Sequence, residues 1–357
     1  MGYFFICYIH SSYTNNITTM TIHFPKPLQP NDLIGITAPS SGIEPALHPK
    51  LDLAINVLQQ RGYKILEGNC LRTEYKNVSD HKQNRANELM SFLTAPEVQA
   101  ILPPRGGELA MEILELIDFE LLAQSKPKWI SGFSDISTIL LPLTLLSNWA
   151  TLHGPNLMQF NVDSSNSSIE SLWEILESSH DQTITQYSSL KHQSNSSSTD
   201  DWEPTQWKRL DSQTAPIEFK GRLIGGCLDS ISRLAGTKFG DIPKFCQQYA
   251  NDGVILYFEN VEMTPCQMVR ALLQLRMLHW FDNLSGILIG RNAMPRIEDN
   301  SLLNDIDALQ AVLGELPIPI LYDVDIGHVP PQMSLINGAL AEVQFTEHSS
   351  SITQFYA

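Results

Sequence analysis

The chain has 357 residues and a formal net charge of −16, with 23 Lys and Arg against 39 Asp and Glu. This balance argues against a nucleic-acid surface, which requires clustered basic residues. The length predicts two domains. The cysteines are scattered and odd in number, which favours reduced thiols in a cytoplasmic protein over disulfides: Cys7, Cys70, Cys227, Cys246 and Cys266.

Residues 1–26 are predicted to form an N-terminal extension outside the globular fold. Their apolar patch, residues 3–9, has no basic flank or small-residue cleavage site, and it is too short to span a bilayer. Met20 precedes the run TIHFPKPLQPNDLIGI, where we expect the protein proper to begin. Residues 1–19 would then be disordered or the product of an upstream start. The remaining sequence contains no transmembrane candidate.

Residues 27–165 are predicted to form the first domain. Short apolar runs such as LIGITAP alternate there with helical patterns such as LDLAINVLQQRGY, and a further helix is expected over 79–102. This alternation is typical of a parallel sheet covered on both faces. In such sheets the functional site lies at the carboxyl ends of the strands.

The segment KWISGFSDISTILL at 128–141 is the most informative of the chain. Residues 129–133 are predicted as a strand and the residues from Asp135 as a helix, so Ser134 lies on the sharp turn between them. Such a turn exposes a serine next to unpaired helix N–H groups, as a nucleophile with an oxyanion hole requires. Ile136 replaces the second glycine of the usual G-x-S-x-G elbow. The alternative is that Ser134 and Asp135 only cap the helix.

Residues 166–218 are predicted to be a linker. It would consist of a helix over 164–177 and an exposed polar loop over 188–201, which is too poor in apolar residues to pack. Trp202 and Trp207 follow this loop. They could form a lid or substrate wall, or they could hold the loop against the second domain by burying their rings.

Residues 219–350 are predicted to form a second α/β domain. Two apolar strands end there in polar residues: GVILYFEN at 253–260 ends in Glu259 and Asn260, and PIPILYDVDIGH at 317–328 ends in His328. The order Ser134, Glu259, His328 is that of many sheet-based serine hydrolases. Alternatively, Glu259 could cap a helix and His328 could be a hydrogen-bonded core histidine.

Metal and phosphate sites are not indicated. The histidines and cysteines show no H-E-x-x-H or C-x-x-C spacing, and the glycine-rich run 221–226 has no P-loop lysine. Cys227 could line a site between the domains, but no histidine partner for it can be identified from the sequence. We therefore expect no metal and no cofactor.

Nine ordered motifs resemble those of the LD-carboxypeptidase family, which includes the microcin C immunity proteins, and together they cover 27–343. The motifs are NDLIGITAPSSG (31–42), SDHKQNRANELMSFLTAPEVQAIL (79–102), RGG (105–107), GFSD (132–135), HGPNLM (153–158), GRLIGGCLDSISRLAGT (221–237), YFEN (257–260), GILIGR (286–291) and DIGHVPP (325–331). The resemblance implies an N-terminal parallel-sheet sandwich domain, like that of class I glutamine amidotransferases or flavodoxins. It also implies a smaller C-terminal α/β domain, with the active site at the interface.

The resemblance also implies the roles of individual residues. Ser134 matches the nucleophile, Glu259 the residue that orients the base, and His328 the base. We expect one ring nitrogen of His328 within hydrogen-bond reach of Ser134 Oγ and the other near Glu259. Backbone N–H groups of Asp135 and of Gly106 or Gly107 match the oxyanion hole, although prolines at 103 and 104 depart from the expected small or apolar residues.

The implied substrate is murein tetrapeptide, cut at an L,D-peptide bond during cell-wall recycling. A peptide-nucleotide antibiotic of the microcin C type, cut at an amide bond, is the alternative, and an inactive binding homologue is a third hypothesis. Arg105 would recognise the substrate carboxylate, or else only hold its own turn by hydrogen bonds. We expect a homodimer with neither nucleic-acid nor membrane partners.

Overall fold

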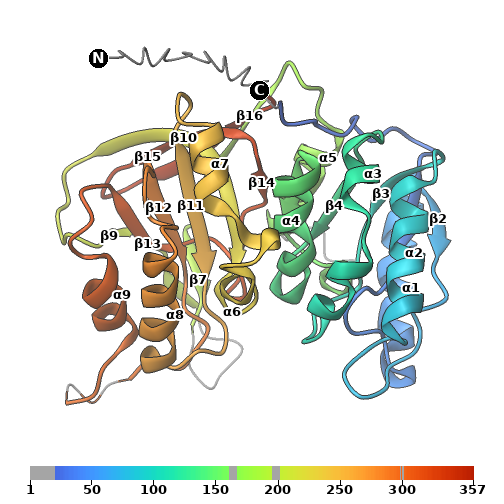
Figure 1. Ribbon diagram of the computed structural model, residues 1–357, viewed down its shortest axis with the longest axis horizontal. Helices are drawn as coiled ribbons and strands as arrows, with labels where there is room; N and C mark the ends of the chain where they lie inside the picture. Colours follow the sequence, from blue (N-terminus) through green and yellow to red (C-terminus); the bar gives the residue numbers. More distant parts are fainter. Residues whose placement is uncertain (1–20, 161–166, 195–201, 298, 300) are drawn as a thin grey trace, which may run out of the picture.

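The computed structural model describes residues 21–160, 167–194, 202–297, 299 and 301–357. Two main sheets stand side by side, and helices cover both (Figure 1). None of the helices in these ranges is long and apolar enough to cross a membrane. The expectations for residues 1–19 and Cys7 lie outside the described residues.

The first sheet has six strands in the order β14-β5-β4-β3-β1-β2. The five strands from the N-terminal half run parallel to one another, as predicted, and β14 pairs antiparallel with β5. The strands are β1 (Leu33–Ile36), β2 (Lys64–Glu67), β3 (Val98–Ile101), β4 (Trp129–Gly132), β5 (Thr151–His153) and β14 (Leu335–Asn337).

Five helices belong to this half: α1 (His48–Gln60), α2 (Lys82–Thr94), α3 (Phe119–Ala123), α4 (Ser137–Ser147) and α5 (Ser167–Glu177). The single helix predicted over 79–102 is wrong, because α2 ends at Thr94 and the chain continues into β3. The reason is the Ala95-Pro96 step: a residue before proline avoids the helical region, and Ala95 has φ −63° and ψ 119°.

The second sheet has eight strands in the order β6-β16-β15-β10-β11-β12-β13-β9. Its four central strands are parallel, and antiparallel strands flank them. The strands are β6 (Thr183–Tyr187), β9 (Lys208–Arg209), β10 (Ile217–Cys227), β11 (Val254–Glu259), β12 (Gly286–Gly290), β13 (Ile320–Val324), β15 (Leu340–Phe345) and β16 (Ser350–Phe355). The helices are α6 (Leu228–Ile231), α7 (Ile242–Gln248), α8 (Pro265–Met277) and α9 (Asp305–Leu313).

The expected domain boundaries need three corrections. Residues 21–26 are not a disordered extension, because Ile22 is buried and His23 N–H donates to Asn148 O at 2.7 Å. Residues 166–218 are not only a linker, since they contribute β6 and β9 to the two edges of the second sheet. With these strands the second sheet is the larger of the two. Within the same range, β7 (Lys191–Gln193) pairs with β8 (Trp202–Pro204). Conversely, β14 belongs to the first sheet although it lies within 219–350.

Helix α4 joins the two halves. Its sequence STILLPLTLLS is apolar nearly all round, and nine of its eleven residues are buried. Such a helix must be covered on every side. It contacts β5 in the first sheet and also β10, α6 and β14, and Figure 1 shows it at the boundary between the halves. The helix that follows Ser134 therefore packs directly against the second half.

Candidate active site

The turn at Ser134 has the strained backbone of a nucleophile elbow. Strand β4 ends at Gly132, Ser134–Ile136 forms a 3-10 turn, and Ser134 has φ +60°. A non-glycine residue in this left-handed region costs about 1–2 kcal/mol. The turn is held by Asn156 on the segment that follows β5, whose Oδ1 accepts a hydrogen bond from Phe133 N–H at 3.3 Å. The strain lies at the residue where a nucleophile would be exposed.

Asp135 fastens the elbow to the loops that surround it. Its Oδ2 accepts hydrogen bonds from Ser40 Oγ at 2.5 Å and from Ala110 N–H at 2.8 Å. Its Oδ1 accepts one from Thr138 Oγ1 at 3.1 Å. The side chain is thus fully used in positioning, which leaves its backbone N–H as the group that could serve chemistry.

Gly106 lies directly against the elbow. A Cβ at this position would be 3.0 Å from Ser134 Oγ and 3.1 Å from Asp135 N. Only glycine therefore lets the RGG turn approach so closely. The structure brings the predicted oxyanion-hole residues Gly106 and Asp135 together beside the serine. Gly107 is adjacent, and a Cβ there would be 2.4 Å from Ser40 Oγ and from Ser41 Oγ.

The second half delivers Glu259 and His328 to the same region. Glu259 ends β11 and is fully buried, and its Oε2 lies 2.9 Å from His328 Nδ1. Gly327 has φ +91°, and a Cβ there would be 2.2 Å from Glu259 Cγ. Glycine is therefore required for the histidine loop to lie on the glutamate. This contact leaves Glu259 no role as a helix cap, since its other oxygen has no hydrogen-bond partner among the described residues. His328 is hydrogen-bonded, as the alternative of a core histidine also expects, but its side chain is 21% exposed and is therefore not enclosed in the core.

The environment of His328 favours its protonated form. Burial lowers the pKa of His328, but the negative charge of Glu259 and its hydrogen bond outweigh burial, so the pKa lies above its usual value. The Phe133 ring packs on the imidazole with a centroid separation of 4.6 Å. Within the described residues, no hydrogen bond joins His328 to Ser134, so of the two expected contacts of the imidazole only that with Glu259 is made.

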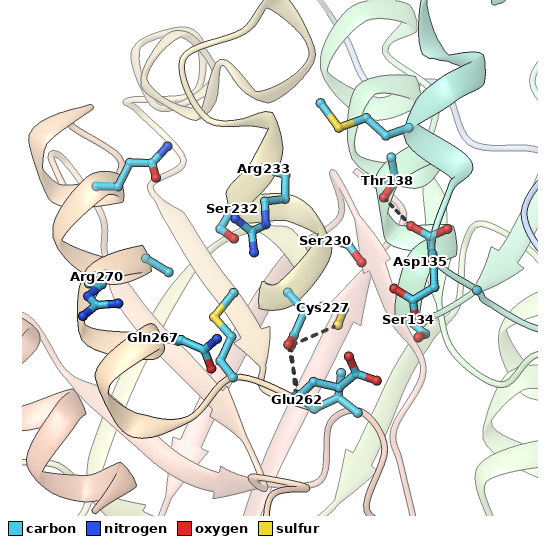
Figure 2. A pocket seen from close by; sticks show the side chains of 18 residues that line it. Ser134, Asp135, Thr138, Cys227, Ser230, Ser232, Arg233, Glu262, Gln267 and Arg270 are labelled. Atoms are coloured by element: carbon cyan, nitrogen blue, oxygen red, sulfur yellow. Dashed lines mark hydrogen bonds between the residues drawn. The ribbon is translucent and has the colours of Figure 1, made fainter. Parts of the chain in front are cut away.

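Ser134 lies between two cavities. One, of about 570 Å³, is lined by Arg105, Gly106, Ser134 and His328. The other, of about 560 Å³, is lined by Ser134, Cys227, Arg233 and Arg270 among others. In Figure 2 Ser134 lies on one wall of the second cavity, Arg270 lies on the opposite side, and Cys227 lies between them. A substrate bound at Ser134 would have room on both sides of the bond under attack.

The remaining candidates differ in their surroundings. Arg105 Nη2 lies 3.1 Å from Glu44 and 3.8 Å from Glu74, whereas its buried Nε has no hydrogen-bond partner among the residues that the structure describes. Trp207 is buried and donates to Asp325 Oδ2 at 2.7 Å, as expected for a residue that holds the loop. Trp202 is 47% exposed on β8. Neither tryptophan is among the described residues that line the two cavities.

Cys227 is closer to the triad than the sequence indicated. One sulfur, oxygen or nitrogen atom from each of Cys227, Glu259 and His328 lies within 4.8 Å of the other two. His328 is thus the neighbouring histidine that could not be identified from the sequence. The strand pairing explains this closeness, because β10 and β11 are neighbouring parallel strands in which Cys227 is in register with Glu259.

His153, at the start of the HGPNLM motif, was not selected from the sequence as a site residue. It is completely buried between Phe133 and Tyr257, and neither ring nitrogen has a hydrogen-bond partner in the described structure. Burial, and to a lesser extent the nearby His328, lowers its pKa to about 3. His153 is therefore neutral beneath the site at any ordinary pH.

This low pKa predicts an acid-sensitive contribution to stability. The unfolded histidine titrates near 6.5, so the contribution is present above that pH and is lost as the pH falls toward 3. Between pH 7 and pH 5 we expect the free energy of unfolding to fall by about 2 kcal/mol less in His153→Leu than in the unsubstituted protein. Urea unfolding of both proteins at the two pH values measures this difference. Equal losses would mean that His153 is solvated or paired.

The fold and the site define an α/β protein with a serine elbow and a glutamate–histidine pair at the junction of two sheets. The chain belongs to the LD-carboxypeptidase family: the model of the family's N-terminal domain matches residues 34–154, and that of its C-terminal domain matches residues 220–343. The protein is thus a member of a hydrolase family of carboxypeptidases.

Similar proteins fall into two groups. A probable murein peptide carboxypeptidase of Bacillus subtilis is 27% identical over 92% of this chain and 93% of its own. The microcin C7 self-immunity protein MccF of Escherichia coli is 23% identical over 92% of this chain and 95% of its own. Two solved structures share the fold at 21% identity. MccF with glutamyl sulfamoyl guanosine has a TM-score of 0.79 over 93% of this chain and 98% of its own, and a muramoyltetrapeptide carboxypeptidase of Oxalobacter formigenes has 0.72 over 90% and 98%.

Proposed function

We propose that this protein is a serine carboxypeptidase that hydrolyses an L,D-peptide bond of murein tetrapeptide through Ser134, His328 and Glu259. The observation that carries the proposal is the contact of 2.9 Å between Glu259 and His328. His328 lines the same cavity as Ser134, whose backbone is strained at φ +60°. A nucleophile, a base and a residue that orients the base are the minimum required for acyl transfer.

The mechanism uses the two ring nitrogens of His328 differently. Nδ1–H donates to Glu259, which leaves Nε2 as the basic nitrogen. Nε2 removes the proton of Ser134 as its Oγ attacks the peptide carbonyl, and the imidazolium then gives this proton to the leaving amine. Water enters, loses a proton to Nε2 and releases the acyl group. The mechanism requires a hydrogen bond between Ser134 Oγ and His328 Nε2 to form when substrate binds, since catalytic hydrogen bonds are often long in free enzymes.

The negative charge on the carbonyl oxygen is stabilised by backbone N–H groups. Asp135 N–H and the amide of Gly106 or Gly107 would supply these donors, and the close approach of Gly106 to Ser134 and to Asp135 N supports this role. One such donor is worth about 3–4 kcal/mol of transition-state stabilisation. No step requires a metal or a cofactor.

The substrate assignment rests on the family and on the murein peptide carboxypeptidase relative. A second candidate is hydrolysis of a peptidyl- or aminoacyl-nucleotide amide, which the likeness to MccF over 92% of the chain favours. Cavities on both sides of Ser134 can accommodate either leaving group. A cytoplasmic location and a homodimer stay predictions.

One experiment separates the candidates. The protein is incubated with murein tetrapeptide and with an aminoacyl sulfamoyl-adenylate, and mass spectrometry follows the cleavage of each. Release of D-alanine from the tetrapeptide is the expected result, and cleavage of the adenylate alone would select the second candidate. Binding of either compound without cleavage would indicate an inactive homologue. Loss of activity in EDTA that zinc restores would contradict the serine mechanism.

Arg105 provides a test of how the substrate carboxylate is recognised. A carboxylate buried at the site needs a cation or several N–H donors. Arg105 lines the cavity beside the elbow, and its Nε–H has no hydrogen-bond partner among the described residues, so this side chain could supply the cation. We expect Arg105→Lys to reduce kcat/KM for free-acid peptides about tenfold more than for their C-terminal amides, because lysine loses the bidentate fork. Steady-state kinetics on paired substrates measure this ratio. Equal losses would mean that Arg105, held by Glu44 and Glu74, only fixes the turn.

A further inference from the structure

Cys227 lies beside the proposed triad, and the hydrolytic mechanism does not use its side chain. Cys227 ends β10, and it is the register partner of Glu259 at the end of β11. Side chains in register on neighbouring strands point to the same side of a sheet. Cys227, Glu259 and His328 thereby form a cluster whose ligand atoms lie within 4.8 Å of one another.

These three residue types form a ligand set for a thiophilic divalent cation. Zn²⁺ takes Cys sulfur at about 2.3 Å and His nitrogen or carboxylate oxygen at about 2.0–2.2 Å, so tetrahedral ligands are about 3.5 Å apart. The cluster needs to contract by only about 1 Å, which side-chain rotations can supply. The fourth position would be taken by water from the cavity that Cys227 lines.

One carboxylate oxygen of this cluster lacks a hydrogen-bond donor among the described residues. Oε1 of Glu259 is buried and has no hydrogen-bond partner within the described structure, whereas its Oε2 contacts His328. Asp229 adds a second carboxylate, 3.6 Å from Cys227 Sγ. Asp229 itself is only partly buried and accepts hydrogen bonds from the backbone N–H groups of Val261 and Glu262. The buried Glu259 oxygen without a donor in the described structure is costly, and a bound cation would compensate for it. The arginines on the same cavity, Arg233 and Arg270, are exposed and lie on other elements.

We propose that Cys227, Glu259 and His328 bind Zn²⁺, and that the bound ion inhibits the enzyme. Binding replaces the thiol proton of Cys227, which is released to solvent, and it occupies a nitrogen of His328. The imidazole can then no longer accept the proton of Ser134. The inhibition rests on the proposed serine mechanism, but the binding of the ion does not.

Binding and inhibition are measured separately, on full-length protein freed of metals with EDTA and kept reduced. Binding of Zn²⁺ is followed by competition with a chromophoric chelator, and Co²⁺ is added to detect thiolate-to-metal charge-transfer absorption. We expect one equivalent of tightly bound Zn²⁺ and a thiolate band. Inhibition is followed with a fluorophosphonate probe that labels the activated serine, and with whichever peptide is hydrolysed.

Cys227→Ser is the informative variant, and Cys246→Ser and Cys266→Ser are controls at a buried and an exposed thiol. Loss of a direct ligand should weaken Zn²⁺ binding roughly 100-fold or more. We therefore expect Cys227→Ser to lose the thiolate band and to be labelled at the normal rate in Zn²⁺ concentrations that block the controls. Cys227→Ala provides the same test if the serine variant does not fold.

Two results would overturn the proposal. One is that the unsubstituted protein binds no Zn²⁺ at micromolar concentrations, and the other is that Zn²⁺ inhibits Cys227→Ser as strongly as it inhibits the controls. A protein that hydrolyses neither candidate substrate would contradict the proposed function alone, because the chelator competition and the Co²⁺ spectrum would still report the site.

Discussion

Ser134→Ala is expected to abolish hydrolysis, lowering kcat/KM at least roughly 10⁴-fold, while the protein remains folded. Removal of the nucleophile leaves only the contribution of the oxyanion hole and of substrate binding. The side chain lines a cavity and is half-buried, so its loss costs little packing. Steady-state kinetics and thermal unfolding of the same preparations give the two measurements.

The backbone of Ser134 provides a matched control. Because φ is +60°, glycine at this position relieves strain that alanine keeps. We expect Ser134→Gly to be as inactive as Ser134→Ala but more stable by about 1 kcal/mol. Substantial residual activity in both variants would show that the attack on the carbonyl comes from another group, and the serine mechanism would have to be abandoned.

The sequence predicted the central strands and the elbow because their signals are local. The strand at 129–133 and the strand that ends in Glu259 are short apolar runs that end in polar residues, and such runs are readable without tertiary information. The run at 317–328 also contains a strand, but β13 ends at Val324 and His328 lies on the loop that follows it. The helix boundary at Thr94 was missed although Pro96 marks it. The edge strand β9 has only two residues, and no periodicity can indicate so short a strand.

Relationships between strands were harder to predict. The pairing of β14 with β5 joins Leu335 to His153 and cannot be inferred from composition. The closeness of Cys227 and Glu259 depends on the register of β10 and β11, and register is set by packing rather than by either strand alone. His153 was missed because no sequence pattern distinguishes a buried histidine whose ring nitrogens have no hydrogen-bond partner in the described part of the chain.

Glu259→Gln is expected to lower kcat/KM by roughly 10⁴-fold, by analogy with other triads. An amide can donate a hydrogen bond to His328 Nδ1, which would place the proton on Nε2 and leave the wrong nitrogen basic. The variant should also change the pH profile. The pKa of His328 is raised by the charge and the hydrogen bond of Glu259 against the effect of burial. Without them burial dominates, and the acid limb of kcat/KM should move to lower pH.

Glu262→Gln is the matched control for this change. Glu262 lies on the loop that follows β11, is exposed, and raises the pKa of His328 only as the last of the contributing charges. Its loss should leave kcat/KM within a few fold and the acid limb almost unmoved, since an exposed charge is screened by solvent. If Glu259→Gln kept the acid limb of the unsubstituted protein, the titrating group would not be His328. If both variants lost activity equally, Glu259 would act through the total negative charge near His328 and not through its contact with the imidazole.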